Sequence, residues 1–277
     1  MSNIYFSVLI SVYCKDDPSF FEKALESVTV NQTLQPNQIV IVEDGPVPKE
    51  IEDAITNVQK ASGDIEFTII RKNKNAGLAA ALNTGLHSCR YEWVARMDSD
   101  DISVPDRFEK QINAIRGTDT DVIGGYIDEF SENIGDIRSI RKVGINRHAI
   151  MKMVKVRTPM NHVSVMYKKN TIIKIGGYSE NFGKLEDYKL WVDLLNESAV
   201  LVNIPDVLVH VRVGNGFLER RSDVREIKDW DMLQDYLIKG NIIGKWHAFK
   251  NKLFIRAFIY TPTWIKRIMY STVLRDK

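Results

Sequence analysis

The sequence lacks both the cysteines of a disulfide-stabilised protein and the long apolar runs of a membrane protein. Its two cysteines, Cys14 and Cys89, are too few for a disulfide framework, and their spacing matches no metal-binding motif. No apolar run approaches the roughly 20 residues that a membrane-spanning helix needs. The first residues show neither the basic nor the apolar segment of a signal peptide. We therefore expect a cytoplasmic protein with free thiols.

Charge is nearly balanced overall but unevenly distributed. The 38 basic and 36 acidic residues give a formal net charge of +2. Residues 239–277 contain nine Lys or Arg and a single acid, so this segment carries +8 and the first 238 residues carry −6. The acidic body and the lack of any nucleic-acid-binding motif exclude nucleic acid as a partner. The basic segment needs another role.

The first hundred residues alternate between apolar runs and helical patterns. The runs at 6–13, 38–42, 66–71 and 91–97 are typical of buried parallel strands, and a helical pattern follows each of them. This alternation predicts an α/β fold with a mostly parallel sheet. With 44% apolar and 27% charged residues, the chain has the composition of a globular protein with a sizeable core.

Polar residues follow the four predicted strands, where such sheets bind ligands. Tyr13, Asp44, Asn75, Asp98 and Asp100 all lie at predicted carboxyl ends. Each alone fits an ordinary turn, but four in succession with carboxylates at two of them favour a nucleotide site. Within that site, Asp44 could accept a hydrogen bond from a base N–H.

The acidic cluster after the fourth run is the strongest signal. Asp98, Asp100 and Asp101 fall within four residues, and residues two apart point the same way in an extended chain. Hard oxygen ligands at a strand end suit Mg²⁺ or Mn²⁺ with phosphate. The alternative is a polar turn in which Asp101 or Ser103 caps the next helix. Arg71 or Lys72 could offset phosphate charge, or be a solvated cation.

The second half offers a second acidic pair. Glu186 and Asp187 open a predicted helix, where acids complement the helix dipole, or where a carboxylate base could accept a proton from an attacking hydroxyl. His210 and Arg212 precede a glycine-containing segment that could face phosphate or acceptor, although a lone strand histidine is usually structural. We also expect a strand over 161–167 and a loop or strand pair over 130–147.

Together these features resemble bacterial family 2 glycosyltransferases of the GT-A fold, in the branch that builds O-antigens, capsules and exopolysaccharides. The resemblance keeps the family's order over about the first 215 residues. It rests on Ser7-Val-Leu-Ile-Ser-Val-Tyr13, Val42-Glu-Asp-Gly45, Asn75-Ala-Gly-Leu-Ala-Ala-Ala-Leu-Asn83, Met97-Asp-Ser-Asp-Asp101, Pro105-Asp-Arg-Phe-Glu-Lys-Gln111, Gly176-Gly-Tyr178, Glu186-Asp187 and Val211-Arg-Val-Gly-Asn-Gly216 with Arg220-Arg221.

The resemblance implies an inverting, metal-dependent transfer of a hexose from a nucleotide-diphospho donor, with UDP the leading nucleotide. Tyr13 and Asp44 would hold the base, Asp98 would face ribose or diphosphate, and Asp100 would bind Mn²⁺ or Mg²⁺. Asp187 would be the general base. The sequence departs from the family at Ser11-Val12, where a proline is usual, and at Glu43, which replaces the first of two aspartates and leaves open which acid meets the base.

The implied architecture is a Rossmann-like mixed sheet flanked by helices, with a C-terminal helical extension. We expect a catalytic domain over 1–217, with a donor half at 1–101 and an acceptor half at 102–217, and an extension over 218–277. The extension mixes apolar and basic residues from 245 to 277, which suits an amphipathic pair of helices lying on anionic lipid. The acceptor implied by the resemblance is a lipid-diphospho-linked saccharide, so we expect a peripheral protein on the inner face of the bacterial inner membrane. Alternatively, these helices pack on the catalytic domain or form a dimer contact.

Two other functions compete with this interpretation. A sugar-nucleotide pyrophosphorylase would also be an α/β nucleotide enzyme, but it should have a glycine-rich phosphate loop after the first strand, and Tyr13-Cys-Lys-Asp-Asp17 has no glycine. A non-catalytic membrane-associated nucleotide-sugar-binding module would not explain why Asp100 and Asp187 are both present.

Overall fold

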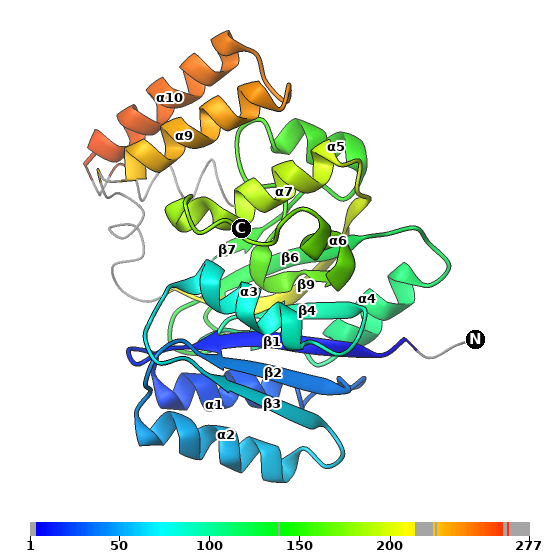
Figure 1. Cartoon of the computed structure of the whole chain (residues 1–277). Coiled ribbons are helices and arrows are strands. Elements are labelled where there is room, and N and C mark those ends of the chain that lie inside the picture. Colours follow the sequence, from blue (N-terminus) through cyan, green and yellow to red (C-terminus); the bar gives the residue numbers. More distant parts are fainter. Residues whose placement is uncertain (1–3, 138, 214–223, 225, 263–264, 266–277) are drawn as a thin grey trace.

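A computed structural model of the chain describes residues 4–262 and 265, apart from 138, 214–223 and 225 (Figure 1). Its centre is one mixed sheet with the strand order β3-β2-β1-β4-β8-β6-β9-β5. The first half contributes four parallel neighbours, which are β1 (Phe6–Val12), β2 (Gln38–Glu43), β3 (Glu66–Arg71) and β4 (Trp93–Met97). The parallel part of the sheet therefore forms from the four apolar runs, as the sequence predicts.

The second half extends this sheet and makes it mixed. The short strand β8 (Met166–Lys168) runs antiparallel to β4, and β6 (Val122–Phe130) runs antiparallel to β8. Next to β6 lies the long parallel strand β9 (Leu201–Arg212), and β5 (Ile102–Ser103) closes the edge. The strand β7 (Ser139–Arg141) pairs with β6, so the strand-pair alternative for 130–147 is the correct one.

Helices cover both faces of the sheet, and alternate strand residues enter the two cores. Val8 and Ile10 pack in one core with α1 (Pro18–Ser27), α2 (Lys49–Ala61) and α4 (Arg107–Ile115). Leu9, between them in β1, enters the other core with α3 (Leu78–Ser88), α5 (Arg147–Met153), α6 (Lys169–Lys174) and α7 (Glu186–Asn196). Because both faces are buried, the strands read as continuous apolar runs.

One predicted strand is wrong over half of its length. Residues His162–Ser164 form the 3-10 helix η1, and only the end of the predicted 161–167 strand pairs, as β8. Ser164 explains the turn, because its hydroxyl donates to the carbonyl of Asn161 at 2.8 Å. Such local side-chain bonds compete with a sheet ladder.

The C-terminal hairpin consists of α9 (Glu226–Lys239) and α10 (Lys245–Tyr260), and Figure 1 shows α9 between α10 and α7. Leu233 and Leu237 of α9 are fully buried in the same core as Trp191 of α7. The extension thus continues the core of the acceptor half. Among the described residues, no helix is long and apolar enough to cross a membrane.

Candidate active site

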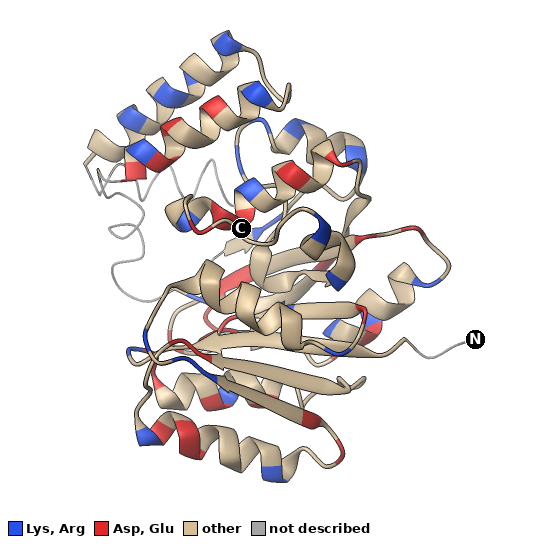
Figure 2. Ribbon diagram, viewed as in Figure 1, with Lys and Arg blue, Asp and Glu red and all other residues tan. Residues whose placement is uncertain are grey.

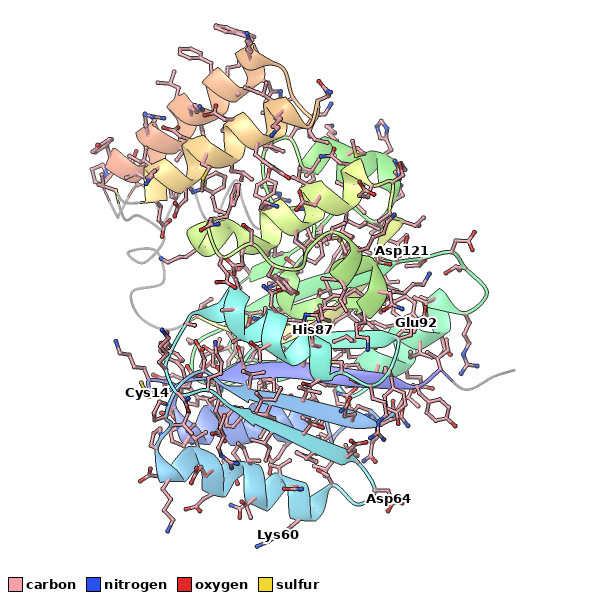
Figure 3. The ribbon with its side chains drawn as sticks, viewed as in Figure 1. Cys14, Lys60, Asp64, His87, Glu92 and Asp121 are labelled. Carbon is pink, nitrogen blue, oxygen red and sulfur yellow. The ribbon has the colours of Figure 1, made fainter. Side chains whose placement is uncertain are left out.

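The carboxyl ends of the parallel strands meet at one edge of the sheet. In Figure 3, Cys14 marks this edge just after β1, whereas Glu92, just before β4, lies toward the opposite edge. Gly45 follows β2 with φ +93°, and a Cβ there would lie 2.7 Å from the backbone nitrogen of Asn75. The loops after β2 and β3 therefore touch, and only glycine permits this approach.

Asp44 organises the loop after β3. Its Oδ1 lies 2.6 Å from Nζ of Lys72, and its carboxylate accepts hydrogen bonds from the backbone N–H groups of Ala76, at 3.0 Å, and Gly77, at 2.8 Å. The side chain is buried. In this arrangement the carboxylate that the sequence assigned to the nucleotide base is bound inside the protein, where it shapes the loop that carries Asn75.

Arg71 and Lys72 have different partners, although the sequence alone left open which of them could offset phosphate charge. Lys72 joins Asp44, while Arg71 pairs with Glu43, its Nε lying 3.2 Å from Oε2, and its side chain is 60% exposed. Glu43 is itself buried, and burial raises the pKa of its carboxyl group. Its Oε1 has no hydrogen-bond partner among the described residues.

The acidic cluster follows β4 and contains two kinds of carboxylate. Asp101 is buried, and its Oδ1 accepts a hydrogen bond of 2.8 Å from the backbone N–H of Arg212, so it ties this loop to β9 rather than capping the next helix. Asp100 still reaches solvent, yet burial by surrounding atoms and the carboxylates of Asp98 and Asp16 raise its pKa to about 6. Like charges this close favour a bound cation.

Arg96 is a buried cation beside this cluster. It lies on β4, is 1% exposed, and forms an ion pair with Asp98, while its Nε has no hydrogen-bond partner among the described residues. Its charge lowers the pKa values of Asp100, Asp101 and Glu186, although burial dominates and the pKa of each is raised overall. One buried guanidinium therefore acts on carboxylates from both halves of the chain.

The donor set fits a divalent cation that shares its shell with a substrate. Within the described ranges, no three His, Cys, Asp or Glu side chains are arranged around a single metal position. Mg²⁺ and similar hard ions, however, are typically held by one or two carboxylates together with substrate phosphates and water. Asp100, with its raised pKa, and the neighbouring Asp98 supply such a pair.

The second acidic pair opens α7, directly after the 3-10 helix η2 (Gly183–Leu185). Glu186 is 7% exposed, and burial followed by the charge of Asp187 raises its pKa to about 7. Its Oε2 has no hydrogen-bond partner among the described residues. Asp187 is half-buried, and its Oδ1 accepts a 2.6 Å hydrogen bond from the backbone N–H of Tyr188. The charge of Arg96 lowers the pKa of Glu186 and that of Asp98 raises it.

His210 and Arg212, predicted as residues that could face phosphate or acceptor, both have partners within the protein. His210 lies within β9, and its Nδ1 is 2.8 Å from both carboxylate oxygens of buried Asp128. Arg212 lies over the rings of Phe20, at 3.8 Å, and Phe130, at 4.6 Å, and its Nε donates to the carbonyl of Asp100 at 3.2 Å. The segment with Gly214, Gly216, Arg220 and Arg221 lies outside the described residues.

The sequence did not single out Arg96 as a site residue, and neither did it single out His162. The sequence contains one indication of the role of Arg96, because a charged residue within an apolar, buried strand requires a partner. Nε2 of His162 lies 3.0 Å from the hydroxyl of Tyr178, and burial lowers the pKa of this histidine. His162 is therefore a partly buried, hydrogen-bonded residue, in agreement with the structural interpretation of a lone histidine.

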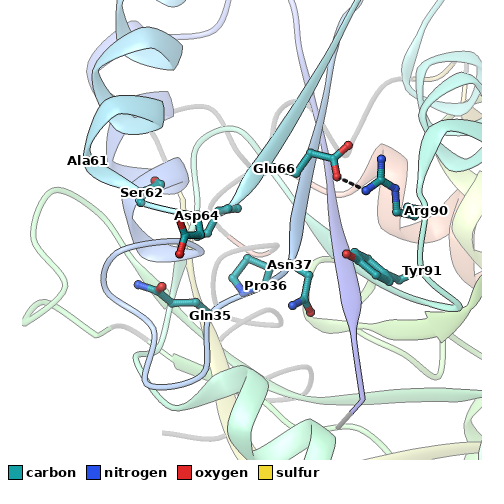
Figure 4. A pocket seen from close by; sticks show the side chains of 11 residues that line it. Gln35, Pro36, Asn37, Ala61, Ser62, Asp64, Glu66, Arg90 and Tyr91 are labelled. Atoms are coloured by element: carbon teal, nitrogen blue, oxygen red, sulfur yellow. Dashed lines mark ion pairs between the residues drawn. The ribbon is translucent and has the colours of Figure 1, made fainter.

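A surface hollow of about 770 Å³ lies at the opposite edge of the sheet (Figure 4). Its lining includes Asn37, Asp64 and Tyr91, which come from the amino-terminal sides of β2, β3 and β4. Glu66 and Arg90 pair across it at 2.7 Å. None of the predicted site residues lines it, so it is separate from the candidate active site.

Similar proteins are glycosyltransferases. A relative from Haemophilus influenzae named an uncharacterized glycosyltransferase is 41% identical, over 98% of this chain and 99% of the relative. The UDP-Gal:alpha-D-GlcNAc-diphosphoundecaprenol beta-1,3-galactosyltransferase of Escherichia coli is 34% identical, over 98% and 96%. The amylovoran biosynthesis glycosyltransferase AmsE of Erwinia amylovora is 36% identical, over 92% and 90%.

Solved structures confirm the predicted GT-A fold. The mannosyltransferase PcManGT of Pyrobaculum calidifontis, in complex with GDP-Man and Mn²⁺, gives a TM-score of 0.63 at 17% identity, covering 95% of this chain and 72% of that one. S. aureus TarS in complex with UDP-GlcNAc gives 0.66 at 14% identity, covering 98% and 76%. The profile of the family described as "Glycosyl transferase family 2" matches residues 7–179. The chain belongs to glycosyl transferase family 2 and is a glycosyltransferase of the GT-A fold.

Proposed function

We propose that the chain transfers a hexose from a UDP-sugar to a hydroxyl group of a lipid-diphospho-linked saccharide, with inversion at the anomeric carbon. The observation that carries this proposal is the position of Arg96. Its buried guanidinium is ion-paired with Asp98 on the donor side, and its charge also acts on Glu186 on the acceptor side. One buried cation that acts on both sets of carboxylates supports a direct transfer, which requires donor and acceptor to be held close together.

The donor half binds the nucleotide diphosphate. Tyr13 and the loop that Asp44 holds flank the base, with Glu43 and Arg71 as a second layer and Asn75 at the loop's exposed surface. Asp98 faces the ribose or the diphosphate. Asp100 would hold Mn²⁺ or Mg²⁺, which when bound stabilises the negative charge of the leaving diphosphate. Arg212 stays near the same loop through the carbonyl of Asp100.

Asp187 acts as the general base. Its carboxylate takes the proton from the acceptor hydroxyl, while that oxygen forms the new bond to the anomeric carbon and the bond to the UDP oxygen breaks on the opposite face. A single displacement of this kind inverts the anomeric centre. Glu186, buried beside it and with a raised pKa, orients the acceptor by hydrogen bonding.

The relatives support the choice of substrates. The Escherichia coli relative is named for UDP-Gal and an alpha-D-GlcNAc-diphosphoundecaprenol acceptor, and the Erwinia amylovora relative for amylovoran biosynthesis. Each matches over at least nine-tenths of its own length. We extend these substrates to this chain as galactose or glucose transfer onto a HexNAc-diphospholipid, in the synthesis of an O-antigen, capsule or exopolysaccharide.

The proposal includes a peripheral position on the inner face of the bacterial inner membrane. Figure 2 shows basic but no acidic residues on α10. This helix also exposes large apolar side chains, with Trp246 68% and Leu253 59% exposed. Such a surface suits anionic lipid. Only part of the predicted 245–277 segment lies within the described residues. Binding of Trp246→Ser/Leu253→Ser to phosphatidylglycerol vesicles at wild-type strength would contradict this role.

A donor and acceptor assay tests the proposed reaction. Wild-type protein is incubated with Mn²⁺ and a panel of UDP-, GDP- and dTDP-sugars, with and without a synthetic GlcNAc-diphospholipid. We expect one UDP-hexose to be consumed only when the acceptor is present, and NMR of the product should show an inverted anomeric linkage. Retention of the donor's anomeric configuration, or consumption with every donor in the absence of acceptor, would refute the proposal.

A further inference from the structure

The turn that leads into the proposed base is held from outside by the C-terminal hairpin. The turn comprises Phe182 and η2, and it ends directly at Glu186 and Asp187. None of the three residues of η2 is buried, and this turn reaches the core only through Phe182 and, in part, Leu185. Segments with few buried contacts are the least stable parts of a fold and need other support.

Helix α9 supplies contacts along this turn. The ring of Tyr236 packs edge-on against Phe182, with 5.5 Å between the ring centroids. Nζ of Lys184 lies 2.6 Å from Oε1 of Glu226, at the start of α9. Gly183 has φ +53°, and a Cβ there would clash with Oδ2 of Asp229. The carboxylate of Asp229 on α9 therefore lies directly against this glycine.

A polar cluster then joins α9 to the body of α7. Lys189 and Asp193 form an ion pair of 2.5 Å with side chains only 17% and 10% exposed. The hydroxyl of Tyr236 donates to the other oxygen of Asp193, also at 2.5 Å. Nζ of Lys189 lies 4.8 Å from the ring centroid of Tyr236 and 5.6 Å from that of Phe182. Tyr236 thus contacts both the turn that precedes the acidic pair and α7, the helix that begins with this pair.

We infer that α9 positions the acidic pair for sugar transfer, with Tyr236, which packs against Phe182 and bonds Asp193, as the positioning residue. The inference rests on the proposed role of Asp187. It makes the hairpin necessary for transfer to the acceptor but not for binding the nucleotide, because α9 contacts η2 and α7, whereas the donor loops follow β1 to β4.

Gly183→Ala tests this inference, because the new methyl group must displace Asp229. Gly63→Ala is the matched control. Gly63 has φ +58°, so alanine there meets the same backbone strain, but nothing lies within 4 Å of its Cβ position. The double variant Gly183→Ala/Asp229→Ala keeps the strain and removes the clash. Transfer is measured with a short-chain, water-soluble GlcNAc-diphospholipid, so that membrane binding does not enter.

We expect Gly183→Ala to lower kcat for transfer by about 10-fold or more, since a misplacement near 1 Å can cost about 100-fold. UDP binding with Mn²⁺ should stay at wild-type affinity. Hydrogen exchange should quicken over 182–190, and the double variant should restore both exchange and kcat. Wild-type kcat in Gly183→Ala, or no rescue in the double variant, would overturn the inference. Hydrogen exchange requires no turnover, so unchanged exchange in Gly183→Ala would overturn this inference whether or not the wild type transfers sugar. Absence of transfer by the wild type would instead refute the proposed function.

Discussion

Asn83 and Tyr178 are 95 residues apart and exchange two hydrogen bonds of 2.8 Å. The amide nitrogen of Asn83, on α3, donates to the carbonyl of Tyr178, and the backbone N–H of Tyr178 donates to Oδ1 of Asn83. Gly177 has φ +75°, and a Cβ there would lie 2.5 Å from the same Oδ1. One asparagine therefore joins α3, which follows the loop of Asn75, to the Gly177-Tyr178 segment.

Asn83→Ala should destabilise the fold by about 2–3 kcal/mol, because it leaves a partly buried N–H and a partly buried carbonyl of Tyr178 without partners. Asn83→Asp keeps an acceptor for the N–H of Tyr178 and removes only the donor to its carbonyl, so this variant should lose less stability than Asn83→Ala. Urea unfolding followed by circular dichroism measures both. Equal stability of wild type and Asn83→Ala would show that the two bonds do not hold the halves together.

Stability should fall as the pH rises from about 4 to 7. Burial and then the charge of Asp187 raise the pKa of Glu186 to about 7, from an ordinary value of 4.5. Between these values the folded chain binds a proton that the unfolded chain has lost, so the free energy of unfolding decreases with pH. The contribution of this group is about 3 kcal/mol. In the absence of divalent cations, Glu186→Gln should show a flatter dependence in urea unfolding at pH 5 and pH 8. An unchanged slope would place the pKa of Glu186 near its ordinary value.

Arg96→Met should move the acid limb of the transfer profile to higher pH. The positive charge of Arg96 lowers the pKa values of Asp100 and Glu186, so its loss lets both carboxyl groups keep their protons longer. We expect transfer at pH 6 to fall about tenfold relative to pH 8, since one pKa unit is a factor of ten in the ionised fraction. Arg90→Met, which removes an exposed pair with Glu66, should leave the profile unchanged. A profile of wild-type shape in Arg96→Met would contradict the role given to this cation.

Lys72→Met should weaken UDP binding more than Arg71→Met. The two cations are neighbours, but Lys72 joins Asp44, which holds the loop of Asn75, while Arg71 is 60% exposed in its pair with Glu43. Exposed pairs contribute little, whereas loss of one partner leaves the buried carboxylate of Asp44 uncompensated. Isothermal calorimetry with UDP and Mn²⁺ should show about tenfold weaker binding for Lys72→Met and less than about threefold for Arg71→Met. The reverse order would mean that Arg71 contacts the nucleotide directly.

The features that depend on local patterns were predictable from the sequence. Continuous apolar runs indicated the four parallel strands, and the rule that ligands bind at the carboxyl ends of such strands grouped Asp44, Asn75 and Asp98 at one edge of the sheet. A local pattern also begins α1, where Pro18 is the first residue and the carboxylate of Asp17 accepts from the N–H of Ser19 at 2.8 Å.

Pairings across long separations in the chain were not predictable. His210 meets Asp128 82 residues away, and Arg212 meets Asp101 111 residues away, and neither spacing has a local signature. The same holds for Asn83 with Tyr178 and for α9 against Gly183. The 161–167 segment was predicted as a strand because its residues favour strands, but hydrogen bonds of the Ser164 hydroxyl stabilise a 3-10 turn there.

The most direct test of the central claim is the transfer activity of Asp187→Asn. Wild type and variant are compared with the donor that wild type uses, Mn²⁺ and the GlcNAc-diphospholipid acceptor, and UDP binding is measured in parallel. The account predicts that transfer falls by at least about 100-fold, in line with loss of a general base, while UDP affinity stays at the wild-type value. Transfer at the wild-type rate would contradict the account, because Asp187 could then not be the group that accepts the acceptor's proton.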